Sequence, residues 1–440
     1  MSTALAPDAG VLDSLLASLA LPAGSAAPTQ PDWLKTLRAR ALERAHALRL
    51  PGTHDEAWRF TPLAALADQS FQPLRTPTQL QPGDIAHLTI PEATTKLVFV
   101  DGVYAPQLSS ASPQAGLVMG NLASLTTAQA AALEAHLGQH APFQDTLFTA
   151  VNTAFLQDAA VLMLPRDTTL AAPVHLLHIA TQPGVASHPR LLLVAGAASR
   201  MTLVEDYVAL HQDAYFTNAV AEVVLQASAQ VTHVRLQRES LQAFHVASCA
   251  VSLGAASHYH SVNLALGAQI SRLDLKVLQT AEGMLCTLDG LALISGAQLA
   301  DTHSFIDHAK PHGTSRQLHK CIVGGAAHAV FNGQVMVRPG AQQTDSAQSS
   351  RNLLLSSRAV VDTQPQLEIF ADDVKCTHGA TVGQLDSDEV FYLQSRGLSE
   401  VVARNLLTYA FGAEVINHIP VASLRQQLEQ TVLEQTKSQP

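Results

Sequence analysis

A thiol and an imidazole lie two positions apart near the end of the chain, at Cys376 and His378. In an extended segment, this spacing places both side chains on the same face. A thiol beside an imidazole or a lysine, here Lys375, loses its proton more readily, and both groups are suitable ligands for iron. Cys376 and His378 therefore form a candidate iron site. The alternative is a small packed cysteine beside a hydrogen-bonded histidine.

Histidine is frequent in this chain, with 20 residues, and several of them cluster. Five histidines lie between residues 301 and 328: His303, His308, His312, His319 and His328. If these residues occupy equivalent positions in stacked strands, they form a ladder, which we interpret as polar and solvated. His258 and His260 share one face of a strand, but no third metal ligand is identifiable from the sequence. A metal site there is the less favoured interpretation.

Several classes of function are excluded by motif and composition. The chain contains no Walker A motif, no GxGxxG after a strand, no GxSxG and no HExxH. Gly324 and Gly325 resemble part of a phosphate loop but lack the Lys-Ser/Thr that follows. A formal net charge of −10 argues against a broad basic face for nucleic acid, and only 14% charged residues argues against disorder or a coiled coil.

Cysteine use and hydropathy suggest a reducing, cytoplasmic location. The four cysteines are widely spaced and form no CxxC pair, which disfavours a disulfide framework or a structural zinc site. No apolar run approaches the roughly 20 residues that span a bilayer. The N-terminus lacks the basic and apolar regions of a secretory signal. We therefore expect no membrane partner and no nucleic-acid partner.

Short β runs begin near residue 161 and dominate the middle of the chain. Small residues recur between them, in turns that start at Gly196, Ala227, Gly254, Gly267, Gly296 and Gly340. Repeated tight corners favour stacked coils over a β-sandwich, which is the other fold with many short strands. The predicted fold is mainly β with helical flanks, built on a right-handed parallel β-helix. We place a mostly helical N-terminal region at residues 1–155, the β-helix at 156–385 and a helical C-terminal domain at 386–440.

Helical periodicity marks the two flanks. Apolar spacing predicts helices at residues 34–48, after a cap at Asp32, and at 127–137 and 146–155; a shorter one is expected within 11–21. A strand at 96–100 should end in a turn at Asp101 and Gly102. Near the C-terminus, Ser399 is positioned to cap one helix, and a second helix follows Pro420.

Longer segments resemble the SufB/SufD family of iron–sulfur cluster assembly scaffolds. The resemblance rests on residues 351–356, 362–383 and 391–397, and it extends to 58–62, 308–312, 330–333 and 342–345. It spans most of residues 50–415. The details are most similar to the SufD branch, because the segment 366–378 has the SufD form and no cysteine precedes Cys249.

The resemblance implies a β-helix and a non-catalytic scaffold role. It implies a complex with a SufB-like paralogue and a SufC-type ABC ATPase, with sulfur supplied indirectly by a cysteine desulfurase and its sulfur-transfer partner. A transient Fe–S cluster would form at the SufB junction, where a family histidine matches His378, and Cys376 lies close by. The isolated chain would be able to form a homodimer. Reduced flavin is associated with some complexes of the family, but no motif here identifies a flavin site.

For the ATPase contact, the resemblance points to the start of the C-terminal helical domain. The residues we expect there are Arg396, Gly397, Leu398, Ala403, Leu407 and Phe411. The alternative is that Leu398, Val402 and Leu406 are core residues, which would leave Arg396 as the better interface candidate. Trp58 and Phe60 are expected to be packing residues.

Two other functions were weighed against the scaffold subunit. The first is a self-sufficient, SufB-like scaffold that accepts sulfur on its own cysteine as a homo-oligomer. The second is a solenoid enzyme, either a polysaccharide lyase or an acyltransferase. The enzyme is disfavoured because the secretory signal typical of lyases and the strict hexapeptide repeat of acyltransferases are both missing.

Overall fold

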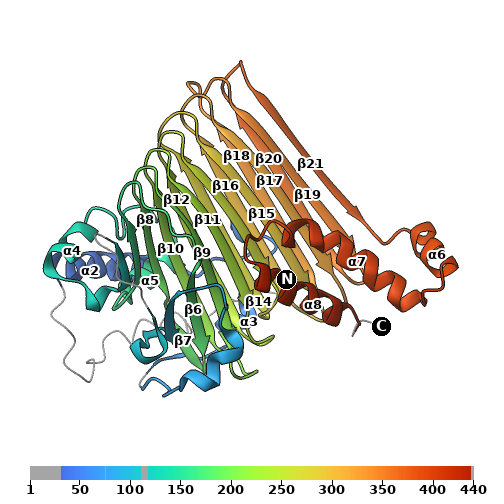
Figure 1. Cartoon of the computed structure of the whole chain (residues 1–440), viewed down its shortest axis with the longest axis horizontal. Helices are drawn as coiled ribbons and strands as arrows, with labels where there is room; N and C mark the ends of the chain where they lie inside the picture. Colours follow the sequence, from blue (N-terminus) through green and yellow to red (C-terminus); the bar gives the residue numbers. More distant parts are fainter. Residues whose placement is uncertain (1–30, 75, 111–116, 438–440) are drawn as a thin grey trace, which may run out of the picture.

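A β-solenoid forms the centre of the molecule (Figure 1). The computed structural model describes residues 31–74, 76–110 and 117–437, so the short helix expected within residues 11–21 lies outside the described residues. Successive strands alternate between two sheets, here called sheet A and sheet B. Neighbouring coils pair in parallel: β10 (Phe216–Leu225) pairs with β12 (Phe244–Leu253) and β12 with β14 (Ile270–Gln279). The predicted mainly β solenoid with helical flanks is confirmed.

The elements occur in the following order. Sheet A also contains β1 (Gln72–Pro73), β4 (Val118–Asn121), β5 (Ala160–Leu164), β7 (Val185–Ser187), β8 (Arg190–Ala195), β16 (Leu299–His308), β18 (His328–Val337) and β20 (Val360–Ile369). Sheet B contains β2 (Thr95–Val100), β3 (Val103–Tyr104), β6 (Val174–Ala180), β9 (Arg200–Ala209), β11 (Gln230–Arg238), β13 (His258–Ala265), β15 (Leu285–Ile294), β17 (Thr314–Val323), β19 (Asp345–Leu354) and β21 (Lys375–Gly383). The helices are α2 (Asp32–Ala47), α3 (Ala64–Ala67), α4 (Thr127–Leu133), α5 (Leu147–Ala154), α6 (Ser387–Ser395), α7 (Glu400–Ile416) and α8 (Ala422–Lys437), with 3-10 turns at Glu56–Trp58, Pro82–Leu88, Pro106–Leu108 and Leu122–Ser124.

The corners predicted from small residues join the strands. At the corners where the chain passes from sheet A to sheet B, the backbone is left-handed at one residue of each coil: Ala198 (φ 57°), Ser228 (φ 59°) and Ala256 (φ 50°). This conformation is costly for residues other than glycine. Here it lets each backbone N–H reach the next coil: Ala198 donates to the carbonyl of Ala227 at 2.9 Å, and Ser228 to that of Ala255 at 2.7 Å. A ladder of backbone hydrogen bonds therefore continues around the corners.

Inside the solenoid, the side chains change from apolar to polar toward the C-terminal coils. Leu191, Leu193 and Leu203 belong to the main apolar cluster of the early coils. In β19, by contrast, the buried positions are occupied by Ser346, Gln348, Ser350 and Asn352. Such groups are tolerated inside a protein when they are hydrogen-bonded. The amide of Gln348 accordingly donates to Gln317 at 2.7 Å, and that of Gln317 to Ser304 at 2.7 Å.

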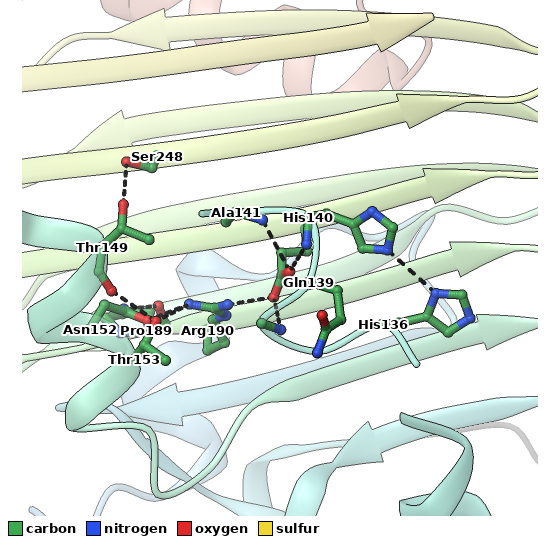
Figure 2. A network of polar contacts seen from close by, with 12 residues as sticks. His136, Gln139, His140, Ala141, Thr149, Asn152, Thr153, Pro189, Arg190 and Ser248 are labelled. Carbon is green, nitrogen blue, oxygen red and sulfur yellow. Dashed lines mark hydrogen bonds and ion pairs between the residues drawn. The ribbon is translucent and has the colours of Figure 1, made fainter. Parts of the chain in front are cut away.

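Glu222 on β10 attaches the N-terminal region to the outer face of sheet A. Figure 2 shows its partners Arg190, His140 and Ala141. Its carboxylate accepts three backbone hydrogen bonds from the loop at residues 138–141, donated by Gly138 (2.8 Å), His140 (2.8 Å) and Ala141 (3.2 Å). It also pairs with the buried guanidinium of Arg190. Arg190 in turn donates to two side chains of α5, those of Asn152 and Thr153. Burial raises the pKa of Glu222, but Arg190 and the loop N–H groups outweigh it and hold that pKa below its usual range.

The N-terminal region contains strands as well as the expected helices. Helices α2, α4 and α5 lie within the three predicted segments or within two residues of them, although Asp32 is the first helical residue rather than the cap and pairs with Lys35. The predicted strand at 96–100 is β2, which pairs with β6 of the solenoid. β4 likewise pairs with β5. The two sheets therefore begin before residue 156.

The C-terminal helices α7 and α8 pack on the outer face of sheet B (Figure 1). Val415 and Ile416 of α7 and Leu424, Leu428 and Val432 of α8 share one buried apolar cluster with Leu291 and Leu293 of β15. Ser399 caps α7 as predicted, accepting a hydrogen bond from the N–H of Val402. Within the described parts of the chain, no helix is both long and apolar enough to cross a bilayer.

Candidate functional site at the open end of the solenoid

The last coil of the solenoid, formed by β20 and β21, is left uncovered. β20 ends sheet A and β21 ends sheet B, so in the described chain each pairs with a strand on one side only (Figure 1). The residues of β21 are exposed except for Cys376, which is half-buried. An exposed strand edge carries unpaired N–H and C=O groups that favour the addition of another strand. This end of the molecule is therefore suited to association.

Cys376 and His378 lie on the inward-facing side of this terminal strand. The register pairs Cys376 with Ser346 and His378 with Gln348 of β19, and both of these partners are buried inside the solenoid. Because side chains alternate along a strand, Cys376 and His378 occupy the last positions of the interior, where the coil above is missing. The structure thus confirms that the two residues share a face. It also shows that this face lies at the open end of the solenoid interior, next to β20 and β21, which we call the mouth.

The thiol of Cys376 is not activated in the isolated chain. Burial raises the pKa of Cys376 and Asp345 raises it further, while a backbone hydrogen bond from Ser346 opposes the shift. The direction is opposite to the one expected from its neighbours Lys375 and His378. The other three cysteines are buried, and burial raises the pKa of Cys249 and Cys321 to about 12 and that of Cys286 as well. Cys376 is the one cysteine that is not buried.

A polar layer lies directly beneath the mouth. Gln348, the neighbour of His378, packs so closely on β18 that a Cβ at Gly333 would lie 2.2 Å from its Nε2 atom. The absence of a side chain at Gly333 leaves room for this amide. On the same level, the hydroxyl of Thr363 on β20 donates to that of Ser350 on β19 at 3.0 Å, which links the two sheets across the interior. The base of the mouth is therefore a hydrogen-bonded surface.

The histidines of residues 301–328 do not form the single solvated ladder that we expected. His308 and His319 are buried inside the solenoid, where burial lowers the pKa of each to about 4. His328 lies on the outer side, bonded to Asp362 at 2.7 Å. His303, also outside, lies 3.0 Å from Asp301. The ladder interpretation is wrong because the strands turn these side chains to opposite faces.

Trp58 is a packing residue, as predicted. Its ring lies 5.4 Å from that of Phe148, and the guanidinium of Arg272 stacks over it at 4.0 Å. Arg272 is itself buried and pairs with Asp274 and Asp301 on the outer face of sheet A. These contacts attach the N-terminal region to the solenoid a second time. Phe60 is partly buried and its ring lies 6.5 Å from His328.

The residues expected at the ATPase interface differ in exposure. Arg396 and Gly397 are exposed in the turn between α6 and α7, where Gly397 has a φ of 94° that other residues rarely adopt. Leu398 and Leu407 are partly buried. Phe411 contacts the solenoid, since the ammonium group of Lys320 lies 4.5 Å from its ring. Ala403 has no exposed surface, so α7 does not present this face to a partner.

Helices α6 and α7 share an exposed apolar face, which includes Val402 and Leu406, two of the three residues considered as core in the alternative. Phe391, Tyr392, Val401, Val402 and Leu406 are 70%, 56%, 59%, 49% and 42% exposed. We call these five residues the α6–α7 apolar face. Sequence periodicity could not identify it, because an apolar stripe that binds a partner has the same pattern as one that binds the core.

Two family models together match most of the chain. Residues 178–411 match the family model of the SufBD core domain of SUF system FeS cluster assembly, and residues 26–176 match the SufBD protein N-terminal region. The chain belongs to the SufB/SufD family. This is a family of iron–sulfur cluster assembly proteins, as the resemblance of residues 362–383 predicted.

Relatives cover nearly the whole chain. An iron–sulfur cluster assembly SufBD family protein of Synechocystis sp. is 39% identical, over 92% of this chain and 91% of the relative. The iron–sulfur cluster assembly protein SufD of Escherichia coli is 33% identical, over 86% and 88% of the two chains. The protein of the same name in Bacillus subtilis is 27% identical, over 93% and 95%.

Proposed function

We propose that this chain is a non-catalytic scaffold subunit of an iron–sulfur cluster assembly complex, paired with a SufB-like paralogue through the open end of its solenoid. The observation that carries the proposal is the uncovered last coil. Both of its strands offer free edges, and its interior positions end in Cys376 and His378. A second solenoid that meets this end would continue the sheets by strand addition. It would also enclose the thiol and the imidazole at the junction.

At that junction, His378 is the residue that we assign to the nascent cluster, which is the cargo of the complex. An imidazole is a suitable ligand for iron, and His378 is exposed at the mouth. Cys376 is less suited to accept sulfur, because burial raises the pKa of its thiol. We therefore assign sulfur acceptance to the paralogue, which would receive it from a cysteine desulfurase and its sulfur-transfer partner.

The α6–α7 apolar face supports binding of a SufC-type ATPase. Three of its side chains project from α7, which packs on sheet B, and two from α6, which contacts α7. A partner held there would therefore be mechanically connected to the solenoid through α7. Arg396 lies beside this face and its guanidinium stacks on Tyr392 at 5.2 Å. We propose that Arg396, Gly397 and Leu398 contribute to the same contact. ATP hydrolysis by the partner would then move the scaffold, which requires no nucleotide motif in this chain.

The test is anaerobic co-expression with SufB and SufC homologues of the same organism, followed by purification through a tag on this chain. Iron and sulfide are then measured for the wild type, for His378→Ala and for the control Thr377→Ala, whose side chain lies on the opposite face of β21. We expect equal assembly of all three complexes and a sharp loss of iron and sulfide in His378→Ala alone. Full iron and sulfide in that variant would disprove the role of His378. Failure of the wild type to assemble would disprove the partner assignment.

The alternative, a self-sufficient scaffold that acts as a homo-oligomer, makes its own prediction for the chain expressed alone. It requires the chain, purified without partners, to hold iron and sulfide with Cys376 as sulfur acceptor. The raised pKa of Cys376 makes this the less favoured function. Stable iron and sulfide on the isolated chain, lost in Cys376→Ser, would reverse that preference.

A further inference from the structure

A cluster of metal-binding side chains lies on the outer face of sheet B, away from the open end of the solenoid. Its members are His260 on β13, Asp289 on β15 and His418 in the turn between α7 and α8. Their potential ligand atoms all lie within 4.8 Å of one another. Among the described residues, this is the one group of three or more such ligands that the structure brings together. The fold thus supplies two ligands for His260 that the sequence analysis did not identify, Asp289 from the next coil and His418 from far along the chain.

The geometry of the cluster is close to that of a metal site. Oδ2 of Asp289 lies 2.8 Å from Nε2 of His260 and 2.8 Å from Nδ1 of His418. With metal–ligand distances of about 2.0–2.1 Å, tetrahedral coordination separates neighbouring ligand atoms by about 3.3 Å. Each of these two pairs therefore needs to open by only about half an ångström, and the two imidazole nitrogens lie within 4.8 Å of each other. His258, on the same strand face, is not part of the cluster.

The surroundings hold the three ligands in place. Asp289 is on a central strand of the sheet and its side chain is only 3% exposed. Ile419 and Val421, which follow His418 in the chain, are both buried in the apolar cluster between sheet B and the C-terminal helices. The backbone of the turn is therefore fixed on the solenoid before any ion binds. The side chain of His418 is 44% exposed, which leaves a coordination position open to water.

We propose that His260, Asp289 and His418 bind a divalent first-row transition metal, which joins the turn between α7 and α8 to the outer face of sheet B. Two imidazoles and one carboxylate with an open position suit Zn²⁺, Co²⁺ or Fe²⁺ rather than Mg²⁺ or Ca²⁺, which prefer sites made of oxygen ligands. The site is independent of His378 and of the partner subunits. It connects the solenoid to the helices that carry the α6–α7 apolar face.

The test uses the full chain, without partners and stripped of metal. Zn²⁺ binding is measured by calorimetry, and Co²⁺ binding by the visible absorption bands of a low-symmetry site. The variants are Asp289→Asn and His418→Gln, both close in shape to the native residue. The control is His211→Gln, which removes a histidine that faces a different carboxylate, that of Asp213. We expect one ion per wild-type chain, and affinity reduced at least about tenfold in both variants but not in the control.

Hydrogen exchange gives a second readout that does not depend on the affinity measurement. Zn²⁺ should slow exchange in residues 417–421 of the wild type and have no such effect in Asp289→Asn. The proposal is overturned if the wild type binds no ion, or if Asp289→Asn and His418→Gln bind as tightly as the wild type. Either result would show that the three side chains are a hydrogen-bonded group without a metal.

Discussion

The attachment of the N-terminal region through Glu222 gives a quantitative test of how the molecule is held together (Figure 2). Replacing Glu222 by Gln keeps the shape of the side chain but removes its charge. The guanidinium of Arg190, which has no exposed surface, then loses its ionic partner. Three N–H groups of the loop at 138–141 lose a charged acceptor at the same time.

The expected cost follows from this burial. Removing one partner of a buried ion pair typically costs about 3–5 kcal/mol, because the remaining charge is uncompensated. If that cost appears as easier local opening of the loop, exchange of its amides should accelerate roughly 140- to 3,700-fold, since about 1.4 kcal/mol corresponds to a factor of ten. The strands of the later coils, such as β15 and β17, should keep their protection.

The assay is hydrogen exchange followed by mass spectrometry on peptides that contain residues 136–155. Glu282→Gln is the matched control, because Glu282 lies at an exposed corner of the solenoid. If Glu222→Gln exchanges at the wild-type rate in this segment, the ion pair does not hold the loop. Protection of the loop amides from exchange would then have to come from the apolar contacts of α5.

Three further predictions concern the mouth, the interior and the helices. The double substitution Val402→Asp and Leu406→Asp should abolish retention of a SufC-type ATPase on the tagged chain. The control Gln426→Asp, on the exposed side of α8, should leave retention unchanged. If the double variant still retains the ATPase, the α6–α7 apolar face is not the contact. In the native chain, iodoacetamide should modify Cys376 alone, and more slowly than an unstructured thiol, because burial raises its pKa; modification of Cys249, Cys286 or Cys321 at a comparable rate would contradict their burial. His319 has a folded-state pKa of about 4, lowered from 6.5 by burial. Between these two values, the unfolded chain binds a proton on this histidine that the folded chain excludes. The free energy of unfolding therefore falls as pH falls from about 6.5 toward 4. Between pH 7 and pH 5 this histidine should account for roughly 2 kcal/mol of lost stability, and urea unfolding of His319→Gln should show a weaker pH dependence by that amount.

The coils of this protein could be predicted from the sequence where corners and strands follow simple rules. Small residues at Gly196, Ala227 and Gly254 marked the corners, because the backbone there turns sharply between closely stacked coils. Short β-forming runs in the sequence, such as residues 219–225 and 231–236, lie within β10 and β11. Each of these signals is local, and each reflects the geometry of one coil.

A strand with a polar interior lacks the apolar alternation by which a strand is predicted from sequence. β19 places Ser346, Gln348, Ser350 and Asn352 inside, so the usual alternation of buried apolar and exposed polar residues is absent. The orientation of α7 was missed for a related reason: Val402 and Leu406 are apolar but exposed, and only a partner would explain them. The meeting of His260 with His418 depends on how the helices dock on sheet B, which no local pattern encodes.

The two ends of the solenoid differ in a way that limits how many molecules can associate. At the N-terminal end, the sheets finish on the short antiparallel strands β3 and β4, and an edge of this kind discourages further pairing. Only the β20–β21 end offers long free edges in the described chain. Joining two such ends consumes both, so growth stops at a pair and cannot continue into a filament. A molecule with one open end therefore sets its own stoichiometry, whether its partner is a paralogue or a second copy.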